Sequence, residues 1–249
     1  MVSRNPWLVG QVSDSYARKR LFCFPYAGGG ATAFLSWRSH LRLNCVALCC
    51  VQLPGHETRF CETQITAIEQ LVPQICDALQ EQLHPPYSFF GHSMGTIVSF
   101  EVTRELANRG HALPEWLLMS GGIAPHRRPA ESLHTLPLAE FVDVVAQRYG
   151  GLPNEVLANQ ELLDVVVPVL RGDFELVERY RYKPGRALPV KIATFGGRQD
   201  PWVSPSDLQS WSDLTTQPEY FQIRLFDGDH FFLSGQQARL LAEIARILA

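Results

Sequence analysis

The chain has 249 residues, of which 46% are hydrophobic and 19% charged, and its formal net charge is −3. A chain of this size can bury one substantial core, and the slight acidic excess gives no electrostatic footprint for nucleic acid or an anionic membrane. No run of 18 or more apolar residues is present, so we expect no transmembrane helix.

The first residues and the cysteines bear on where the protein works. Residues 1–19 are mixed and polar, with Trp7 and Leu8 as the expected anchors, and the first six residues lack the apolar centre of a signal peptide. The six cysteines stand mostly in apolar runs, and no two form a Cys-x-x-Cys pair. We therefore expect buried, reduced thiols in a cytoplasmic protein, and no metal site.

The first chemical feature is a glycine-rich loop that follows a strand. Residues 20–24 form a short apolar run that predicts a buried strand, and residues 25–32 continue it with a loop that holds three consecutive glycines. The loop lacks the Gly-Lys-Ser/Thr ending of a P-loop and the Gly-x-Gly-x-x-Gly spacing of a dinucleotide site. In hydrolases such a loop directs a backbone N–H at the reacting carbonyl oxygen, and a plain structural turn is the alternative.

The next part of the chain alternates between predicted helices and strands. Apolar runs predict strands over residues 45–51, 87–90 and 116–120, and helical spacing is found over 34–43, 65–83 and 96–109. Pro73 interrupts the second of these helices and is expected either to kink it or to stand in its first turn. This alternation predicts an α/β fold, with a mostly parallel, doubly wound sheet between two layers of helices.

The stretch Gly91-His92-Ser93-Met94-Gly95 lies between a predicted strand and a predicted helix. Gly-x-Ser-x-Gly in this context predicts a nucleophile elbow, in which a strained turn lifts the serine hydroxyl above the sheet. Glycines are needed because side chains there would clash where strand and helix come together. The first N–H groups of the helix would face an oxyanion formed at Ser93. His92 is expected to point away from the serine and to be structural.

The pattern changes over residues 125–182, where helical stretches follow one another and no strand is predicted. In an alternating chain such a block indicates an inserted lid. We therefore expect an α/β core over residues 1–124 and 183–249, and a helical lid over 125–182. Strands are predicted again at 190–195 and 220–226, and an amphipathic C-terminal helix follows with Ser234 and Gln237 as its expected capping box.

Asp200 and His230 each stand in a loop after one of these last strands. In α/β-hydrolases the acid and then the histidine follow the nucleophile in this order, and parallel sheets place their sites at the carboxyl ends of strands. We therefore expect Ser93 as nucleophile, His230 as base and Asp200 as the acid that orients it. Asp227 and Asp229 are rival acids beside His230, but neighbours rarely aim at each other, so we expect them to form turns.

Several stretches together carry a family resemblance. They include Pro-Tyr-Ala-Gly-Gly, Gly-His-Ser-Met-Gly and Gly-Asp-His-Phe-Phe, and they lie at residues 21–29, 52–57, 91–95, 170–174, 195–201 and 228–233. In these stretches the chain resembles the type II thioesterases, the stand-alone editing hydrolases of nonribosomal peptide and polyketide synthesis, which have the α/β-hydrolase fold. Two departures are Tyr26, where members often carry histidine, and Gly172, where alanine is usual before Asp173.

The resemblance implies an acyl thioester on the phosphopantetheine arm of an acyl or peptidyl carrier protein as the substrate, and no cofactor of the enzyme's own. It implies the backbone N–H groups of Ala27 and Met94 as the oxyanion hole, and a lid that roofs an apolar acyl pocket. Basic side chains would contact an acidic carrier or the phosphate of its arm, with a solvated charged face as the alternative. The candidates are Arg179, Arg181, Lys183 and Arg186, extended by Arg127 and Arg128.

Other functions remain open at this point. A general medium-chain acyl thioesterase or esterase would use the same residues, and so would an enzyme that transfers the acyl group to an alcohol or amine. A non-catalytic ligand receptor can also keep this fold. Nothing in the sequence indicates an obligate interface, so we expect a monomer.

Overall fold

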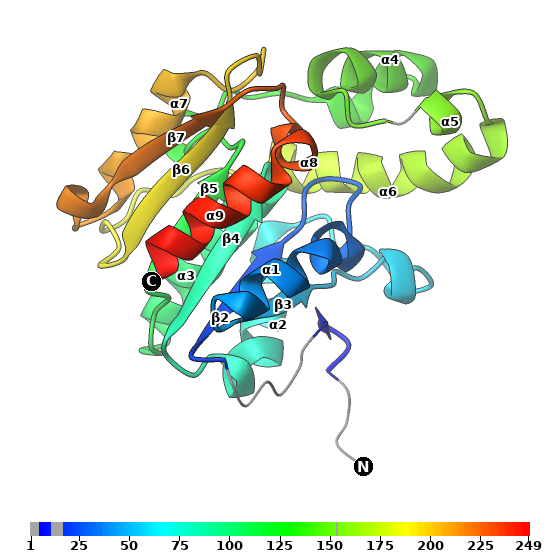
Figure 1. The fold of residues 1–249 in the computed structure, drawn as a ribbon. Helices are drawn as coiled ribbons and strands as arrows, with labels where there is room; N and C mark the ends of the chain where they lie inside the picture. Colours follow the sequence, from blue (N-terminus) through cyan, green and yellow to red (C-terminus); the bar gives the residue numbers. More distant parts are fainter. Residues whose placement is uncertain (1–4, 11–16, 153) are drawn as a thin grey trace.

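The structure is a computed structural model that describes residues 5–10, 17–152 and 154–249. The expected absence of a signal peptide falls in part on residues 1–4, outside the described residues. Within the described chain a seven-stranded sheet has the order β1-β3-β2-β4-β5-β6-β7 (Figure 1). In sequence order the strands are β1 Leu8–Val9, β2 Lys19–Phe24, β3 Val46–Val51, β4 Tyr87–His92, β5 Trp116–Ser120, β6 Lys191–Gly197 and β7 Gln222–Phe226.

The sheet is parallel except at one edge, where the short β1 pairs antiparallel with β3. Helices cover both faces of the sheet (Figure 1), which confirms the predicted α/β class. The α-helices are α1 Arg38–Leu43, α2 Ile68–Leu79, α3 Met94–Asn108, α4 Leu138–Tyr149, α5 Asn154–Leu157, α6 Gln160–Arg179, α7 Pro205–Gln209, α8 Phe232–Gly235 and α9 Gln237–Leu248. No helix in the described ranges is both long and apolar enough to cross a membrane.

Two hydrophobic cores lie on the two faces of the sheet. Leu21 and Cys23 of β2 belong to the core under α1 and α9, whereas Phe22 and Phe24 belong to the core under α2 and α3. This division follows from the strand period of two, because successive side chains point to opposite faces. A strand buried on both faces therefore reads as a continuous apolar run, which is the pattern that predicted it.

The order in which strands are added to the sheet reverses between β2 and β4, although the two strands are parallel. From β2 the chain crosses to β3 on one side, and it then returns to β4 on the other side of β2. Such a switch point leaves a crevice outside the carboxyl ends of the two strands, where α/β proteins bind ligands. The glycine-rich loop follows β2 and Ser93 follows β4, so both predicted parts of the site leave the sheet at this crevice.

The predicted lid region contains helices and no strand among its described residues. Helices α4, α5 and α6 extend beyond the end of the sheet (Figure 1), and their apolar side chains form a separate cluster that includes Phe141, Val145, Leu170 and Phe174. The 3₁₀ turns Pro125–Arg127 and Leu133–Thr135 lead from β5 to α4. Pro153, in the linker between α4 and α5, lies outside the described residues.

Several helix boundaries differ from the prediction. Residues Ala31–Trp37 form a 3₁₀ helix and the α-helix begins only at Arg38, while Pro73 lies inside α2. The predicted capping box at Ser234 was wrong, because Ser234 lies inside the short α8 and α9 begins after Gln236 without a side-chain cap. Two further 3₁₀ turns, Glu57–Arg59 and Gln80–Gln82, lie in the first half of the chain, and Ser210–Leu214 and Pro218–Tyr220 precede β7.

The cysteines match the expectation in part. All six are free thiols, and Cys23, Cys49, Cys50 and Cys76 are buried. Cys45 and Cys61 are exposed, which corrects the expectation that these thiols are buried. Trp7 and Leu8 are buried as predicted, at 9% and 8% exposure.

Candidate active site

Ser93 stands on a sharp turn between β4 and α3. Its backbone has a φ of 51°, a positive value that non-glycine residues rarely adopt. The strained turn is held on both sides, because the Ser93 N–H donates to Ser120 O at 2.8 Å and the Thr96 N–H donates to Ser93 O at 3.0 Å. Such strain persists only where the surroundings enforce it, which is characteristic of functional sites.

The two glycines of the motif allow the strand and the helix to touch. A Cβ on Gly91 would lie 2.2 Å from Gly95 O, and a Cβ on Gly95 would lie 2.2 Å from Phe24 O at the end of β2. Both atoms belong to the backbone and cannot move aside as a side chain could. The sharp turn that presents Ser93 therefore requires glycine at both positions.

His230 and Asp200 form a buried pair at the ends of the last two strands. The distance between His230 Nδ1 and Asp200 Oδ2 is 2.8 Å, and the two side chains are 2% and 0% exposed. The other carboxylate oxygen of Asp200 accepts from the backbone N–H groups of Trp202 at 2.8 Å and Val203 at 3.1 Å. The loop after β6 therefore fixes the carboxylate, and the carboxylate fixes the imidazole.

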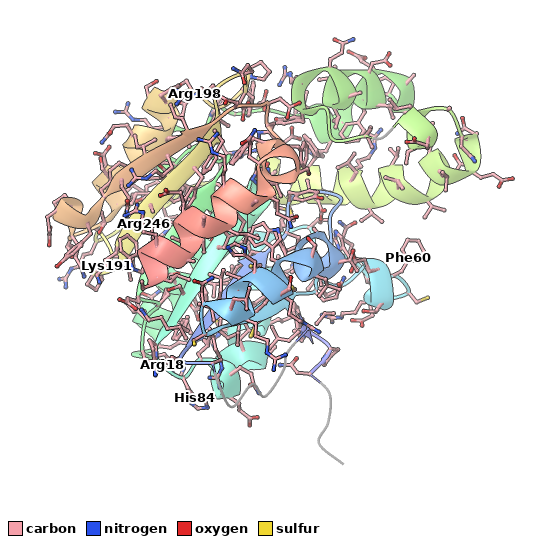
Figure 2. The ribbon with its side chains drawn as sticks, viewed as in Figure 1. Arg18, Phe60, His84, Lys191, Arg198 and Arg246 are labelled. Atoms are coloured by element: carbon pink, nitrogen blue, oxygen red, sulfur yellow. The ribbon has the colours of Figure 1, made fainter. Side chains whose placement is uncertain are left out.

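The rival acids point elsewhere. Asp227 is 67% exposed and lies 3.4 Å from Arg198, which is at the outside of the molecule (Figure 2). Asp229 Oδ1 accepts from the Phe231 N–H at 2.9 Å, so it stabilises the turn that leads into α8. Among the three aspartates, Asp200 is the one that contacts the His230 ring.

His92 is fully buried, and its ring packs 5.1 Å from the His230 ring, measured between centroids. Its Nδ1 is 2.9 Å from Ser120 Oγ, whereas its Nε2 has no hydrogen-bond partner within the described chain. Burial, followed by the nearby charge of His230, lowers the pKa of His92 well below its usual value. A neutral ring that supports His230 fits these contacts better than a second base.

The backbone N–H groups of Ala27 and Met94 are available at the floor of this site. Met94 is the first residue of α3, so its N–H has no partner within the helix. The Ala27 N–H likewise makes no hydrogen bond within the described ranges, although Gly28 and Gly29 beside it both donate. Ala27, Ser93, Met94 and His230 line one pocket.

The walls of this pocket are mostly apolar side chains of the lid region. They are Val145, Leu152, Leu170, Phe174 and Val177, and Trp202 and Phe231 close the side next to His230. Tyr26 and Tyr149 also line the pocket, and burial raises the pKa of Tyr149 to about 12. An apolar chamber with a nucleophile at its floor can hold an acyl chain and exclude water from it.

The predicted basic residues line more than one pocket. Arg128 lines the pocket beside Ser93, and burial lowers the pKa of its guanidinium. Arg181 and Lys183 line a second groove, which they share with Arg104 and with the acidic side chains Glu69, Glu101 and Glu105. Arg179 is paired with Glu175 at 2.5 Å. The surface is therefore of mixed charge.

Sequence reasoning missed the side chains that hold the glycine-rich loop. The Gly28 N–H donates to Asp173 Oδ2 at 2.7 Å, and the Ala31 N–H donates to Gln52 Oε1 at 3.1 Å. Glu57 accepts from the N–H and the hydroxyl of Thr32. These side chains lie in stretches 52–57 and 170–174, which contributed to the family resemblance but had no assigned chemical role. That resemblance was the one sequence signal that could have pointed to them.

Known proteins are similar to this chain over most of its length. A family model described as "Thioesterase domain" matches residues 19–248. The chain is 37% identical over 251 residues to Linear gramicidin dehydrogenase LgrE of Brevibacillus parabrevis, covering 99% of this chain and 94% of that protein. It is 36% identical over 230 residues to Gramicidin S biosynthesis protein GrsT of Aneurinibacillus migulanus, covering 92% and 88%. The structure of the type II thioesterase BorB from the borrelidin biosynthetic cluster superposes with a TM-score of 0.84 at 31% identity, covering 97% and 96% of the two chains.

Proposed function

The chain belongs to the thioesterase domain family and has the α/β-hydrolase fold, and from this premise we propose that it is an editing thioesterase. Its substrates would be acyl groups held as thioesters on the phosphopantetheine arms of carrier proteins in nonribosomal peptide or polyketide synthesis. The observation that carries this proposal is the buried pair of His230 and Asp200, which shares an apolar pocket with Ser93. We expect it to work in the cytoplasm, because its six free thiols suit a reducing compartment.

In the proposed reaction Ser93 Oγ attacks the thioester carbonyl carbon while His230 takes its proton. Asp200 keeps Nδ1 of His230 protonated, so that Nε2 is free to accept. The N–H groups of Ala27 and Met94 would stabilise the oxyanion, and one such donor is worth roughly 3 kcal/mol. The thiol then leaves, and water activated by His230 releases the acid.

The leaving group makes a thioester easier to expel than an amide. A thiol has a pKa of about 8.5, so its thiolate needs less help from a general acid than an amine does. The more difficult task for the enzyme is to choose among acyl chains. We assign this choice to the proposed lid over residues 125–182, whose side chains Val145, Phe174 and Val177 line the pocket.

The mixed surface around Arg181 and Lys183 is the candidate docking site for the carrier, together with Arg179 and Arg186. An acidic partner would be attracted by these cations, and the glutamates in the same groove would limit the attraction to certain orientations. Replacing Lys183 and Arg186 with glutamate should therefore raise KM for a carrier-bound substrate and leave hydrolysis of a small soluble thioester unchanged.

A redox activity, suggested by the name of the relative LgrE, is less well supported. The loop does fit the looser spacing Gly-x-Gly-x-x-Ala, from Gly28 to Ala33. In a dinucleotide site, however, the pyrophosphate rests on free N–H groups at the start of a helix. Here the first two N–H groups of the helix, those of Ala31 and Thr32, are already held by Gln52 and Glu57, and the Glu57 carboxylate would repel a phosphate.

The test measures acid release from an acyl-carrier protein and from the same acyl group on a short soluble thiol, with Ser93→Ala as the control. A strong preference for the carrier that disappears in the variant is the expected result. Equal rates on both substrates would point to a general acyl hydrolase. Absence of Ser93-dependent release from either would exclude the serine mechanism for those acyl groups, and products other than the free acid would indicate acyl transfer.

A further inference from the structure

A buried carboxylate of the lid helix reaches the glycine-rich loop. Asp173 lies in the second half of α6 and is 1% exposed. Its Oδ2 accepts from the Gly28 N–H at 2.7 Å and lies 2.9 Å from His56 Nε2. Its Oδ1 accepts from Gln64 Nε2 at 2.7 Å. Three segments that are distant in sequence therefore meet on one side chain.

His56 neutralises this carboxylate. Its Nδ1 is 3.0 Å from Pro54 O, and its Nε2 faces Asp173, so both ring nitrogens face acceptors, an arrangement that favours the doubly protonated ring. Burial lowers the pKa of His56, but the hydrogen bond and charge of Asp173 and the smaller contributions of Pro54 O and Glu57 outweigh it, so that the pKa is raised. With His56 protonated, the pair places no net negative charge behind the loop that is expected to bind an oxyanion.

The contact with Gly28 fixes the turn that presents Ala27. The Gly29 N–H donates to Tyr26 O at 2.9 Å and Gly28 has a φ of +75°, which are the features of a type II turn over residues 26–29. The central peptide of such a turn, between Ala27 and Gly28, is rotated by half a turn in the alternative type I form. A carboxylate bound to the Gly28 N–H holds this peptide in one orientation, and with it the ψ angle of Ala27.

Gly172 gives Gln64 access to Asp173. A Cβ on Gly172 would lie 2.1 Å from Gln64 Oε1 and 2.5 Å from Gln64 Cδ, so the amide occupies space that only glycine leaves open. From there Gln64 Nε2 also donates to Val169 O at 2.8 Å. The amide thus holds the carboxylate plane so that Oδ2 points at the loop. Gly172 is one of the two positions at which the sequence departs from the resemblance.

We propose that Asp173 is a positioning residue for the oxyanion hole, which it links to the lid helix, and that Gly172 and Gln64 orient it in this chain. The inference rests on the proposed function in one respect, because it takes the Ala27 N–H as an oxyanion donor. An oxyanion donor acts in the transition state and not on the bound substrate, so a misplaced donor lowers kcat and leaves KM unchanged.

The main test compares Asp173→Asn with Glu178→Gln, using an acetyl thioester of a small soluble thiol. Glu178 is a matched control because it is another buried carboxylate of α6, 4% exposed, and it accepts from the backbone N–H groups of Leu133 and His134 at 2.9 Å each. Removing an oxyanion donor costs about 100-fold to 1000-fold, so displacing one in Asp173→Asn should lower kcat by about 10-fold to 100-fold at constant KM. Glu178→Gln should lower Tm without this change in kcat.

A second pair of variants keeps the inference testable if Asp173→Asn does not fold. Gly172→Ala adds a methyl group that displaces the Gln64 amide, yet alanine is the better helix former, so the helix should not be weakened. We expect kcat to fall by about threefold to tenfold, less than for loss of a donor. The same fall is expected in Gln64→Ala, and adding Gly172→Ala to Gln64→Ala should lower kcat no further.

The outcomes separate this inference from the proposed function. If a fluorophosphonate does not label Ser93 in the unmodified protein, the proposed function fails. If labelling occurs but Asp173→Asn and Glu178→Gln have the same kcat per folded molecule, the positioning role is wrong. A full effect of Gly172→Ala in the absence of Gln64 would equally overturn the part assigned to Gly172.

Discussion

Asp200→Asn is the substitution that most directly tests the proposed triad, because the structure dictates how the new amide must sit. In the unmodified protein one carboxylate oxygen accepts from the N–H groups of Trp202 and Val203, and the other faces His230 Nδ1 at 2.8 Å. The asparagine oxygen must face the two backbone donors, since the reverse orientation would direct its NH₂ group at both of them. The NH₂ group therefore faces His230.

This orientation of the amide changes the tautomer of His230. An amide N–H donor opposite Nδ1 requires Nδ1 to be an acceptor, so the proton moves to Nε2, the nitrogen that must accept from Ser93. In serine hydrolases the wrong tautomer lowers kcat by about 10⁴-fold, which corresponds to roughly 5.4 kcal/mol of transition-state stabilisation. The change in shape is minimal, so we expect Tm to remain close to that of the unmodified protein.

The assay is kcat and KM on an acyl thioester of a soluble thiol, with Asp227→Asn and Asp229→Asn as matched controls. Both controls remove the same charge from the loop next to His230, and neither carboxylate contacts the ring, so both should keep full activity. An Asp200→Asn enzyme that is folded and retains more than about a tenth of kcat would refute the assignment, given the 10⁴-fold expectation. So would a large loss in Asp229→Asn alone.

Three further predictions test the turn, the pocket and the buried pair. Gly95→Ala should destabilise the protein by about 1–3 kcal/mol in urea unfolding and reduce activity, because its Cβ meets backbone at 2.2 Å, whereas Gly235→Ala, with open space around it, should not. Val145→Phe should impair hydrolysis of longer acyl chains but spare acetyl thioesters, since Val145 lines the pocket. Val166 belongs to the same lid cluster but is not among the residues that line the pocket, so Val166→Phe should change chain preference less. Equal losses for all chain lengths in Val145→Phe would contradict this prediction. The raised pKa of His56 means that its contribution to stability is complete below the unfolded pKa of about 6.5 and is lost as pH rises through the folded pKa. Urea midpoints measured from pH 6 to 9 should therefore fall more in the unmodified protein than in His56→Gln.

Much of the fold could be predicted because its strands are buried on both faces. The continuous apolar runs near residues 20–24, 45–51 and 116–120 could hardly be anything but central strands, and each is within two residues of the observed one. Helix starts were less predictable. A helix was predicted over residues 34–43, but a 3₁₀ helix begins at Ala31 and the α-helix only at Arg38. Gln52 and Glu57 hold the first N–H groups of the 3₁₀ helix from another loop, and such long-range contacts leave no local pattern.

The candidate site likewise contains residues that local sequence predicts and one, Asp173, that it does not. Ser93, Asp200 and His230 could be proposed from the sequence because each follows a strand, and strand ends can be located from local sequence. Asp173 lies inside an amphipathic helix and resembles any helical carboxylate in sequence. Its contact is with a loop 145 residues away, so only the folded structure reveals that contact. The capping box placed at Ser234 failed for a related reason, since Ser234 lies inside α8, whose Phe232 and Leu233 are buried in the fold.

Helix α6 also shows why the predicted lid should not be regarded as one mobile unit. Leu170, Phe174 and Val177 recur at helical spacing and line the pocket beside Ser93, while Leu176, together with Val177, belongs to the main core beneath α3. Asp173 lies between these faces and accepts from the N–H of Gly28 in the glycine-rich loop. A rigid displacement of the second half of α6 would therefore disturb the pocket wall, the core and the loop together. Opening of the pocket is more easily accommodated by α4 and α5, whose apolar contacts lie mainly within the lid cluster.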